Sequence, residues 1–142
     1  MSVPEKRIVD FIGEHHVLTL ATVAENAPWC ANCFYVYLEE ENCFVFTSDD
    51  KTKHVQDVET NKNVAGSVVL ETQTVGKIQG IQFRGIMERP DKGIDGKAKK
   101  AYLKKFPYAV LMKTSLWVLK PEYIKMTDNR LGFGKKLIWE EE

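Results

Sequence analysis

Short runs of β-forming residues, separated by turns of only a few residues, place the strongest constraint on how this chain can fold. The runs at 17–23 and 29–39 flank the turn-forming segment 25–28, and the polar segment 39–42 leads into a third run at 43–48. Parallel neighbours need a crossover of a dozen or more residues, so connections this short join antiparallel strands. We therefore predict two successive antiparallel hairpins.

The second half of the chain continues in the same way, with further β-forming runs at 64–70, 78–88 and 116–127. In the run 78–88, apolar Ile81 and Phe83 alternate with polar Gln82 and Arg84, which indicates one buried and one open face. Pro121 interrupts the last run, and a proline there belongs at a sheet edge or a bulge. Helical spacing of apolar residues predicts short helices at 4–12, 51–61 and 97–106.

This order of elements predicts a single, mainly β domain over residues 1–142, an antiparallel β-barrel with flanking helices. An open α+β sheet is the alternative architecture. The chain is 44% hydrophobic, enough for a full core.

Lys plus Arg equals Asp plus Glu at 20 each, which argues against a nucleic-acid or membrane binder, since both need a basic field. No apolar run approaches the roughly 20 residues that span a bilayer. Three cysteines do not suit a disulfide framework, and the first residues do not resemble a signal peptide, so we expect a cytoplasmic protein.

The segment 43–54 reads as an apolar strand that ends at hydroxyls and carboxylates and continues into a helix. A helix N-terminus offers unpaired backbone N–H groups and a partial positive charge, which suits a phosphate. The side chains that would complete such a seat are Thr47, Ser48, Thr52 and Lys53, with His54 as a further donor. An ordinary capped strand–helix junction is the alternative interpretation.

Two other clusters favour a structural role. Cys30 and Cys33 form a CxxC pair, but within a strand a spacing of three sends them to opposite faces, which suits neither redox nor metal chemistry. The lysine-rich segment 97–105 is expected to be a solvated helix face. No catalytic acid, base or nucleophile set is visible, and no metal site is expected.

The tail 127–139 is unusual because two glycines flank Phe133, cations lie beside them, and an apolar Leu-Ile-Trp segment follows. Tails are commonly frayed and polar. This one is expected to pack, with a partner subunit as one candidate surface.

Taken together, the segments TSDDKTKH, QGIQFRG and TDNRLGFGKKLIW resemble the FMN-binding split-barrel family typified by pyridoxamine 5'-phosphate oxidase, in particular its short bacterial members. The resemblance covers residues 17–139. It implies a homodimer that holds FMN at the subunit interface.

By position, the resemblance implies that one strand lies along the flavin, with contacts from Ala31, Asn32, Cys33, Phe34, Tyr35 and Val36. Phe46 and Thr47 match the end of the next strand. Thr52 and Lys53 match an Arg-Lys pair that grips the phosphate in the family. Because Thr52 replaces the arginine, the seat is expected to be weaker or to rely on Ser48 and His54.

The family's hairpin glutamine falls near Gln79 or Gln82, and Gln82 is preferred because it lies on the polar face. A family arginine falls near Lys135. The substrate-phosphate arginines of the oxidase have no clear counterpart, so we expect a flavin-dependent oxidoreductase on another small molecule. The alternatives are a non-catalytic module for flavin or haem, and a dimerising barrel with an empty groove.

Overall fold

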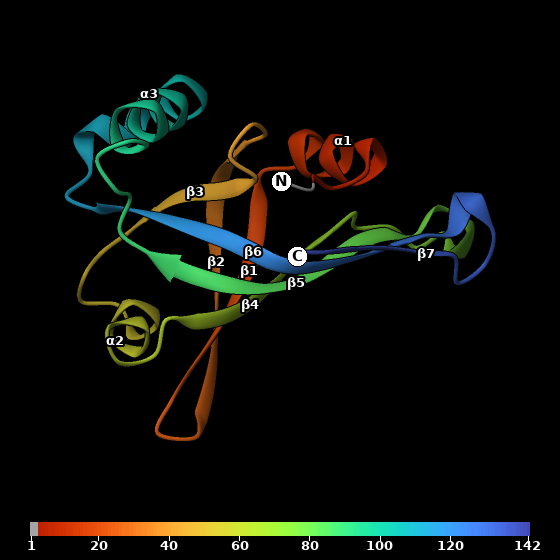
Figure 1. Ribbon diagram of the computed structural model, residues 1–142, viewed down its shortest axis with the longest axis horizontal. Helices are drawn as coiled ribbons and strands as arrows, with labels where there is room; N and C mark the ends of the chain where they lie inside the picture. Colours follow the sequence, from red (N-terminus) through yellow and green to blue (C-terminus); the bar gives the residue numbers. More distant parts are fainter. Residues whose placement is uncertain (1–2) are drawn as a thin grey trace.

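The computed structural model describes residues 3–142 as one sheet that curls into a barrel (Figure 1). The strands are β1 (Val17–Ala24), β2 (Ala27–Leu38), β3 (Cys43–Ser48), β4 (Asn63–Val69), β5 (Gln79–Glu88), β6 (Ser115–Asp128) and β7 (Lys136–Glu140). Every pairing is antiparallel, in the order β3-β2-β1-β4-β5-β6-β7, and a further β3–β6 pairing closes the first six strands into a ring. The predicted antiparallel barrel with flanking helices is confirmed.

Three α-helices lie around this barrel (Figure 1): α1 (Lys6–Glu14), α2 (Lys53–Thr60) and α3 (Asp95–Lys105). Short 3-10 turns add η1 (Val75–Lys77), η2 (Pro107–Leu111) and η3 (Asn129–Leu131). Helix α2 packs mainly on β1, and α3 packs on β2 and β3. Each predicted helix is present, with ends that differ by one or two residues.

The barrel interior is filled by one contiguous apolar cluster. Phe44 and Phe83 stack with ring centroids 4.6 Å apart, and Leu20, Ile81 and Leu119 around them are almost fully buried. The alternation predicted for residues 78–88 is observed, since Ile81 and Phe83 face this core while Gln82 and Arg84 are exposed. Outward residues of the strands therefore form a separate face, which matters for the site.

Pro121 lies where β6 changes partners. β6 pairs with β3 as far as Leu119 and with β7 from Tyr123 onward, so the missing N–H of Pro121 falls between the two ladders. Opposite it, the β5–β6 register shifts between Arg84 and Gly85, as expected for a bulge. A Cβ on Gly85 would lie 2.2 Å from the Lys120 carbonyl oxygen, so only glycine fits this close approach.

Three local expectations differ from the structure. The turn between β1 and β2 is only Glu25 and Asn26, both with positive φ, and Pro28 belongs to β2. The end of the tail pairs with β6 of its own chain and buries Trp139 there. Lys105 is not fully solvated, because its ammonium donates to the carbonyl oxygens of His15 and Tyr35.

The β6–β7 hairpin projects from the barrel as an arm, together with η1 (Figure 1). Next to the turn of this hairpin, Asp128 is fully buried and accepts hydrogen bonds from the Arg130 side chain at 3.0 and 2.8 Å. Arg7 of α1 lies 3.4 Å from the same carboxylate, so this group connects the arm to the N-terminal helix. The hydrogen bonds from Arg130 hold the pKa of Asp128 below its usual value.

Asp128→Asn should lower the free energy of unfolding at pH 7 by about 1.5–3 kcal/mol, because it removes charge-assisted hydrogen bonds. A carboxyl with a depressed folded-state pKa stabilises the fold above its unfolded pKa of about 3.9, and this contribution is lost as pH falls toward the folded-state value. Urea unfolding of both proteins at pH 7 and pH 3 measures the difference. A gap that does not shrink in acid would contradict the assignment.

Candidate functional site

A row of polar side chains crosses the outer face of the sheet. The pairings place Asn32 beside Thr19, Thr19 beside Ser67, Ser67 beside Gln82, and Gln82 beside Lys125. Cross-strand partners project to the same side of a sheet, so the row runs over five strands. Thr19 donates a hydrogen bond to the amide oxygen of Asn32 at 2.9 Å. The predicted site residues Asn32 and Gln82 thus share one surface.

Apolar side chains flank this row without a cover. Phe34 is 59% exposed and pairs with Val17, and Val69 is 66% exposed and pairs with Gly80. Gly80 has no side chain, so the surface of the sheet is depressed at that point. A flat surface with exposed apolar groups beside amides and hydroxyls can take a planar, hydrogen-bonding molecule or another protein surface.

At the β3–α2 junction the predicted residues Ser48, Thr52 and His54 lie close together, but their polar groups contact one another. His54 is buried, and its Nε2 lies 2.8 Å from the Ser48 hydroxyl and 3.4 Å from that of Thr52. Burial lowers the pKa of His54, while the nearby Asp57 opposes that shift. The Cys33 thiol beside Ser48 has a pKa raised by burial to about 11. This group is therefore a neutral polar cluster at the end of the barrel.

Lys53 already has a partner. Its ammonium lies 2.5 Å from Asp57, whose buried carboxylate also accepts a hydrogen bond from Thr22 at 2.9 Å. The Lys53 hydrogen bond is the main cause of the lowered pKa of Asp57. In the candidate phosphate seat, the positive charge of Lys53 is thus neutralised by the buried Asp57 carboxylate, so the electrostatic attraction of the seat for an anion is reduced.

The loop before α2 is also satisfied from within. Asp49 accepts a hydrogen bond from the Lys51 amide at 2.8 Å, and its carbonyl accepts one from the Thr52 hydroxyl at 2.8 Å. Thr52 is the residue that precedes the helix, although its side chain makes no capping hydrogen bond. Residue types that favour caps predicted this junction correctly, but the hydroxyl contacts the loop rather than the helix.

Helix α3 and Phe106, which follows it, contact the predicted flavin strand on its outer face. The Tyr102 hydroxyl donates to the Phe34 carbonyl oxygen at 3.3 Å and lies 3.4 Å from the Thr47 hydroxyl. The rings of Phe34 and Phe106 are 5.5 Å apart. Tyr102 and Phe106 were missed as site residues because their spacing in the sequence indicates only the inward face of a helix.

The remaining predicted residues are spread out. Tyr35 and Phe46 have fully buried side chains, so only their backbone can contact a ligand, and Ala31 pairs with inward-facing Leu20. Val36 is half-buried. Lys135 lies on the arm, across the barrel from α2 (Figure 1). Asp57, Thr19 and Ser67 join the site through strand pairing and packing, which residue spacing alone does not reveal.

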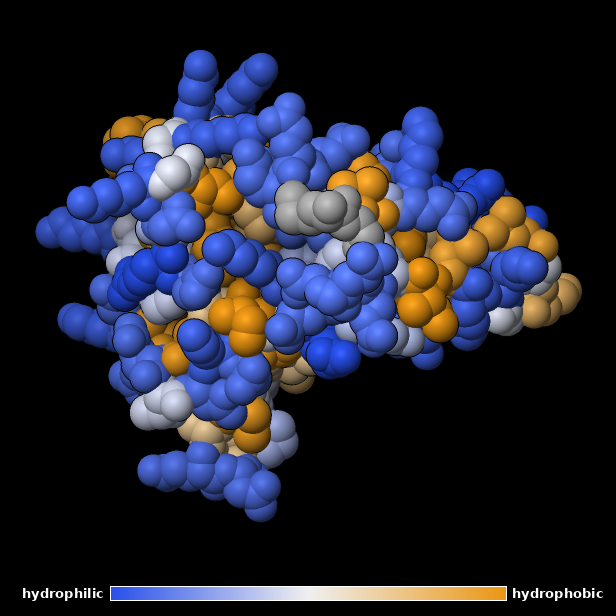
Figure 2. Space-filling view, viewed as in Figure 1, coloured by the Kyte–Doolittle hydropathy of each residue, from blue (hydrophilic) through white to orange (hydrophobic). Residues whose placement is uncertain are grey.

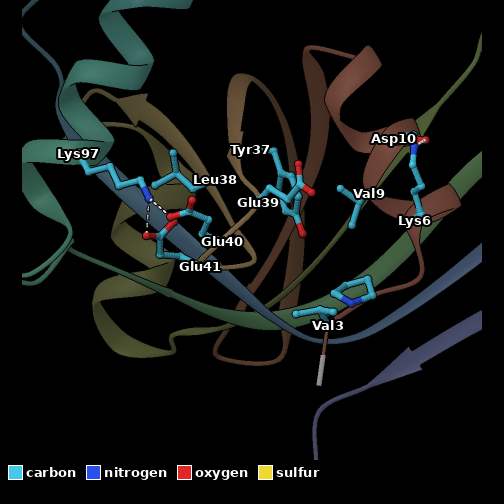
Figure 3. Close-up of a pocket in the computed structure, with 11 residues that line it drawn as sticks. Val3, Lys6, Val9, Asp10, Tyr37, Leu38, Glu39, Glu40, Glu41 and Lys97 are labelled. Carbon is cyan, nitrogen blue, oxygen red and sulfur yellow. Dashed lines mark hydrogen bonds and ion pairs between the residues drawn. The ribbon is translucent and has the colours of Figure 1, made fainter. Parts of the chain in front are cut away.

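A wide hollow of about 1000 Å³ lies between α1, the β2–β3 turn and the start of α3 (Figure 3). Its wall is acidic, with Glu39, Glu40 and Glu41 from the turn, and Lys97 pairs with Glu40 and Glu41 at 2.8 and 2.7 Å. The predicted site residues lie outside its lining. An acidic wall does not favour a phosphate, so this hollow is not a candidate seat for FMN.

Comparison with protein families matches residues 4–128 to the family described as pyridoxamine 5'-phosphate oxidase. A relative from Photorhabdus laumondii, a UPF0306 protein, is 40% identical over 130 residues, which cover 92% of this chain and 91% of the relative.

Solved structures with the same fold include a heme binding protein from Mycobacterium smegmatis, with a TM-score of 0.75 and 21% identity over 88% of this chain and 52% of that one. A FAD binding protein from the same organism has a TM-score of 0.68 and 18% identity, covering 83% of this chain and 90% of that one. These identities show a shared fold. The match over residues 4–128 confirms the resemblance seen in the sequence: this chain belongs to the pyridoxamine 5'-phosphate oxidase family.

Proposed function

We propose that this protein is a homodimer that binds FMN on the outer sheet face and uses it as an oxidoreductase on a small molecule. The observation that carries the proposal is the polar row from Asn32 to Lys125 with uncovered Phe34 and Val69 beside it. Flavin- and haem-binding proteins that share the fold support a planar cofactor at this face. Bound FMN would supply hydride or electron transfer.

The outer face suits the ring system of a flavin. Its ring edge carries both donors and acceptors, and Asn32 and Gln82 offer amides that can pair with either. Phe34 and Val17 provide an apolar surface beside these amides. The phosphate would lie near Thr52 and Lys53, where the compensation of Lys53 by Asp57 implies modest affinity.

Two of the three histidines are engaged within the chain, which favours flavin over haem. His54 Nε2 faces the Ser48 hydroxyl inside the barrel, and His15 Nδ1 is 2.8 Å from the Phe11 carbonyl oxygen. Both rings therefore have other partners, although imidazole is a common haem ligand. The heme binding protein of the same fold still makes haem the alternative ligand.

A second copy is proposed to cover the outer face and complete the site. Exposed Phe34, Val69 and Ile138 spread across this face on three strands. Lys135 lies on the arm, and hydrophobic side chains also reach the surface of that arm (Figure 2). Within one chain Lys135 is remote from α2, so a contribution of Lys135 to the flavin would have to come from the partner subunit.

Purified protein is expected to show flavin absorbance bands, or to take up one FMN per chain on titration. Haem would give a Soret band instead. Protein that binds neither cofactor would refute the proposal and favour a barrel with an empty groove.

Lys53→Ala should weaken FMN binding about tenfold, the lower end of what one charge-assisted hydrogen bond contributes, because Asp57 shares the ammonium. Riboflavin lacks the phosphate, so its affinity should change less. Lys51→Ala removes an exposed lysine two residues earlier and serves as the control. Equal losses for FMN and riboflavin would place the phosphate away from Lys53.

Val69→Glu should convert the dimer to monomer, because a charge on the covered face would be desolvated without a partner. Gln56→Glu adds the same charge at an exposed position of α2 and should leave the dimer intact. Light scattering after size exclusion measures the mass of each. A wild-type monomer at micromolar concentration, or a dimeric Val69→Glu, would contradict this interface.

A non-catalytic flavin-binding module is the second candidate function. It is favoured by the neutral chemistry of the site, where Asn32, Thr47 and Gln82 are amides or hydroxyls and His54 is buried. Reduction of the bound flavin by a nicotinamide cofactor, followed by turnover with an acceptor, supports the oxidoreductase. Bound flavin that stays oxidised under these conditions supports the module.

A further inference from the structure

A cavity of about 380 Å³ lies between α3, η2 and the outward side of β3 and β6. Its size falls within the range typical of small-molecule pockets. Thr47 and Leu116, which are cross-strand partners, form its floor. Leu103 of α3, together with Ala109, Val110 and Met112, contributes much of its wall. The cavity is distinct from the outer face described above, because no member of the row from Asn32 to Lys125 lines it.

The residues that line this cavity are polar and apolar in equal part, and the polar or charged ones are Thr47, Asp95, Lys99, Tyr102 and Thr114. Tyr102 and Thr47 bring hydroxyls 3.4 Å apart, and burial raises the pKa of Tyr102, so its hydroxyl stays protonated. Asp95 and Lys99 lie one helical turn apart, so their charges oppose each other. An anionic ligand would therefore gain little, whereas Val110, Met112 and Leu116 offer apolar contact.

The segment over the cavity carries apolar side chains in solvent. Val110 is 70% exposed and Met112 is 61% exposed, and both line the cavity. Exposed apolar side chains around a concave site are a mark of ligand binding, since burial by a ligand recovers the cost of their exposure.

We propose that this cavity binds the substrate, an uncharged molecule of one or two rings that also carries polar groups. The assignment of substrate rests on the proposed flavin function. Tyr102 lines the cavity, and its hydroxyl donates to the Phe34 carbonyl oxygen. Phe34 lies on the proposed flavin face, so this hydrogen bond links the two sites. Tyr102 and Thr47 would position one polar atom of the molecule by hydrogen bonds.

The probe N-phenyl-1-naphthylamine, which fluoresces in apolar surroundings, tests the cavity directly. Saturable binding of one probe per chain is expected, tighter than that of 8-anilino-1-naphthalenesulfonate, which differs by a sulfonate. Tighter binding of the sulfonate would overturn the assignment of an uncharged ligand.

Two adjacent variants locate the probe. Val110→Asp places a charge in the cavity wall and should weaken binding at least about tenfold. Leu111→Asp is the matched control, since Leu111 is 81% exposed and lies outside the cavity lining, so probe affinity should stay within about twofold. Equal effects of the two variants, or none for Val110→Asp, would overturn the proposal.

The two proposals fail separately. If the protein binds FMN but not the naphthylamine, the flavin function stands and the proposed cavity ligand is refuted. If the protein binds the naphthylamine at Val110 but binds no flavin, the cavity is a ligand site, and its role as a substrate site is refuted.

Discussion

The pairing of β3 with β6 is the constraint on which the rest of the fold depends. It joins residues 44–48 to residues 115–119 and turns an open sheet into a ring. Closure removes the edges of β3 and of the first half of β6, and it encloses one set of alternating side chains as the core. The other set is left outside, and α3 covers part of it.

The coverage of that outer surface is uneven. Helix α3 covers β2 and β3, where Val45 is fully buried although it points outward from the barrel. Over β1, β4 and β5 no helix lies on the outward residues Thr19, Ser67 and Gln82 of the described chain. The boundary between the two regions runs along β2, and Phe34 lies on it with 59% exposure. The hydrogen bond from Tyr102 to the Phe34 carbonyl oxygen links the two proposed sites at this boundary.

The sequence predicts the strands and helices well because local signals define them. Alternation at 78–88 and short polar turns identify β5 and the hairpins, and Pro121 correctly indicates a bulge. The partner switch of β6 was not predictable, because the pairing of residues 115–119 with β3 joins segments some 70 residues apart and leaves no local signal. The row from Asn32 to Gln82 could not be predicted for the same reason, because its members come from four strands.

The predicted phosphate seat shows how a correct local pattern can be altered by packing. The capping residues and Lys53 lie at a helix start, as the pattern indicates. However, Thr22 from β1 and Asp57 from within α2 form a buried group that takes up the ammonium of Lys53. The pair Lys53–Asp57 at a spacing of four is visible in the sequence, but the burial of Asp57 depends on how α2 packs against β1.

This buried group also constrains how an anion can bind. A dianion near Lys53 would face the Asp57 carboxylate, so binding must either share the ammonium or separate the ion pair, and both reduce the net gain. Thr52, the residue before Lys53, adds no positive charge to this site. Affinity for a flavin would then come chiefly from its ring on the outer face, where Phe34, Asn32 and Gln82 make contacts that do not depend on charge.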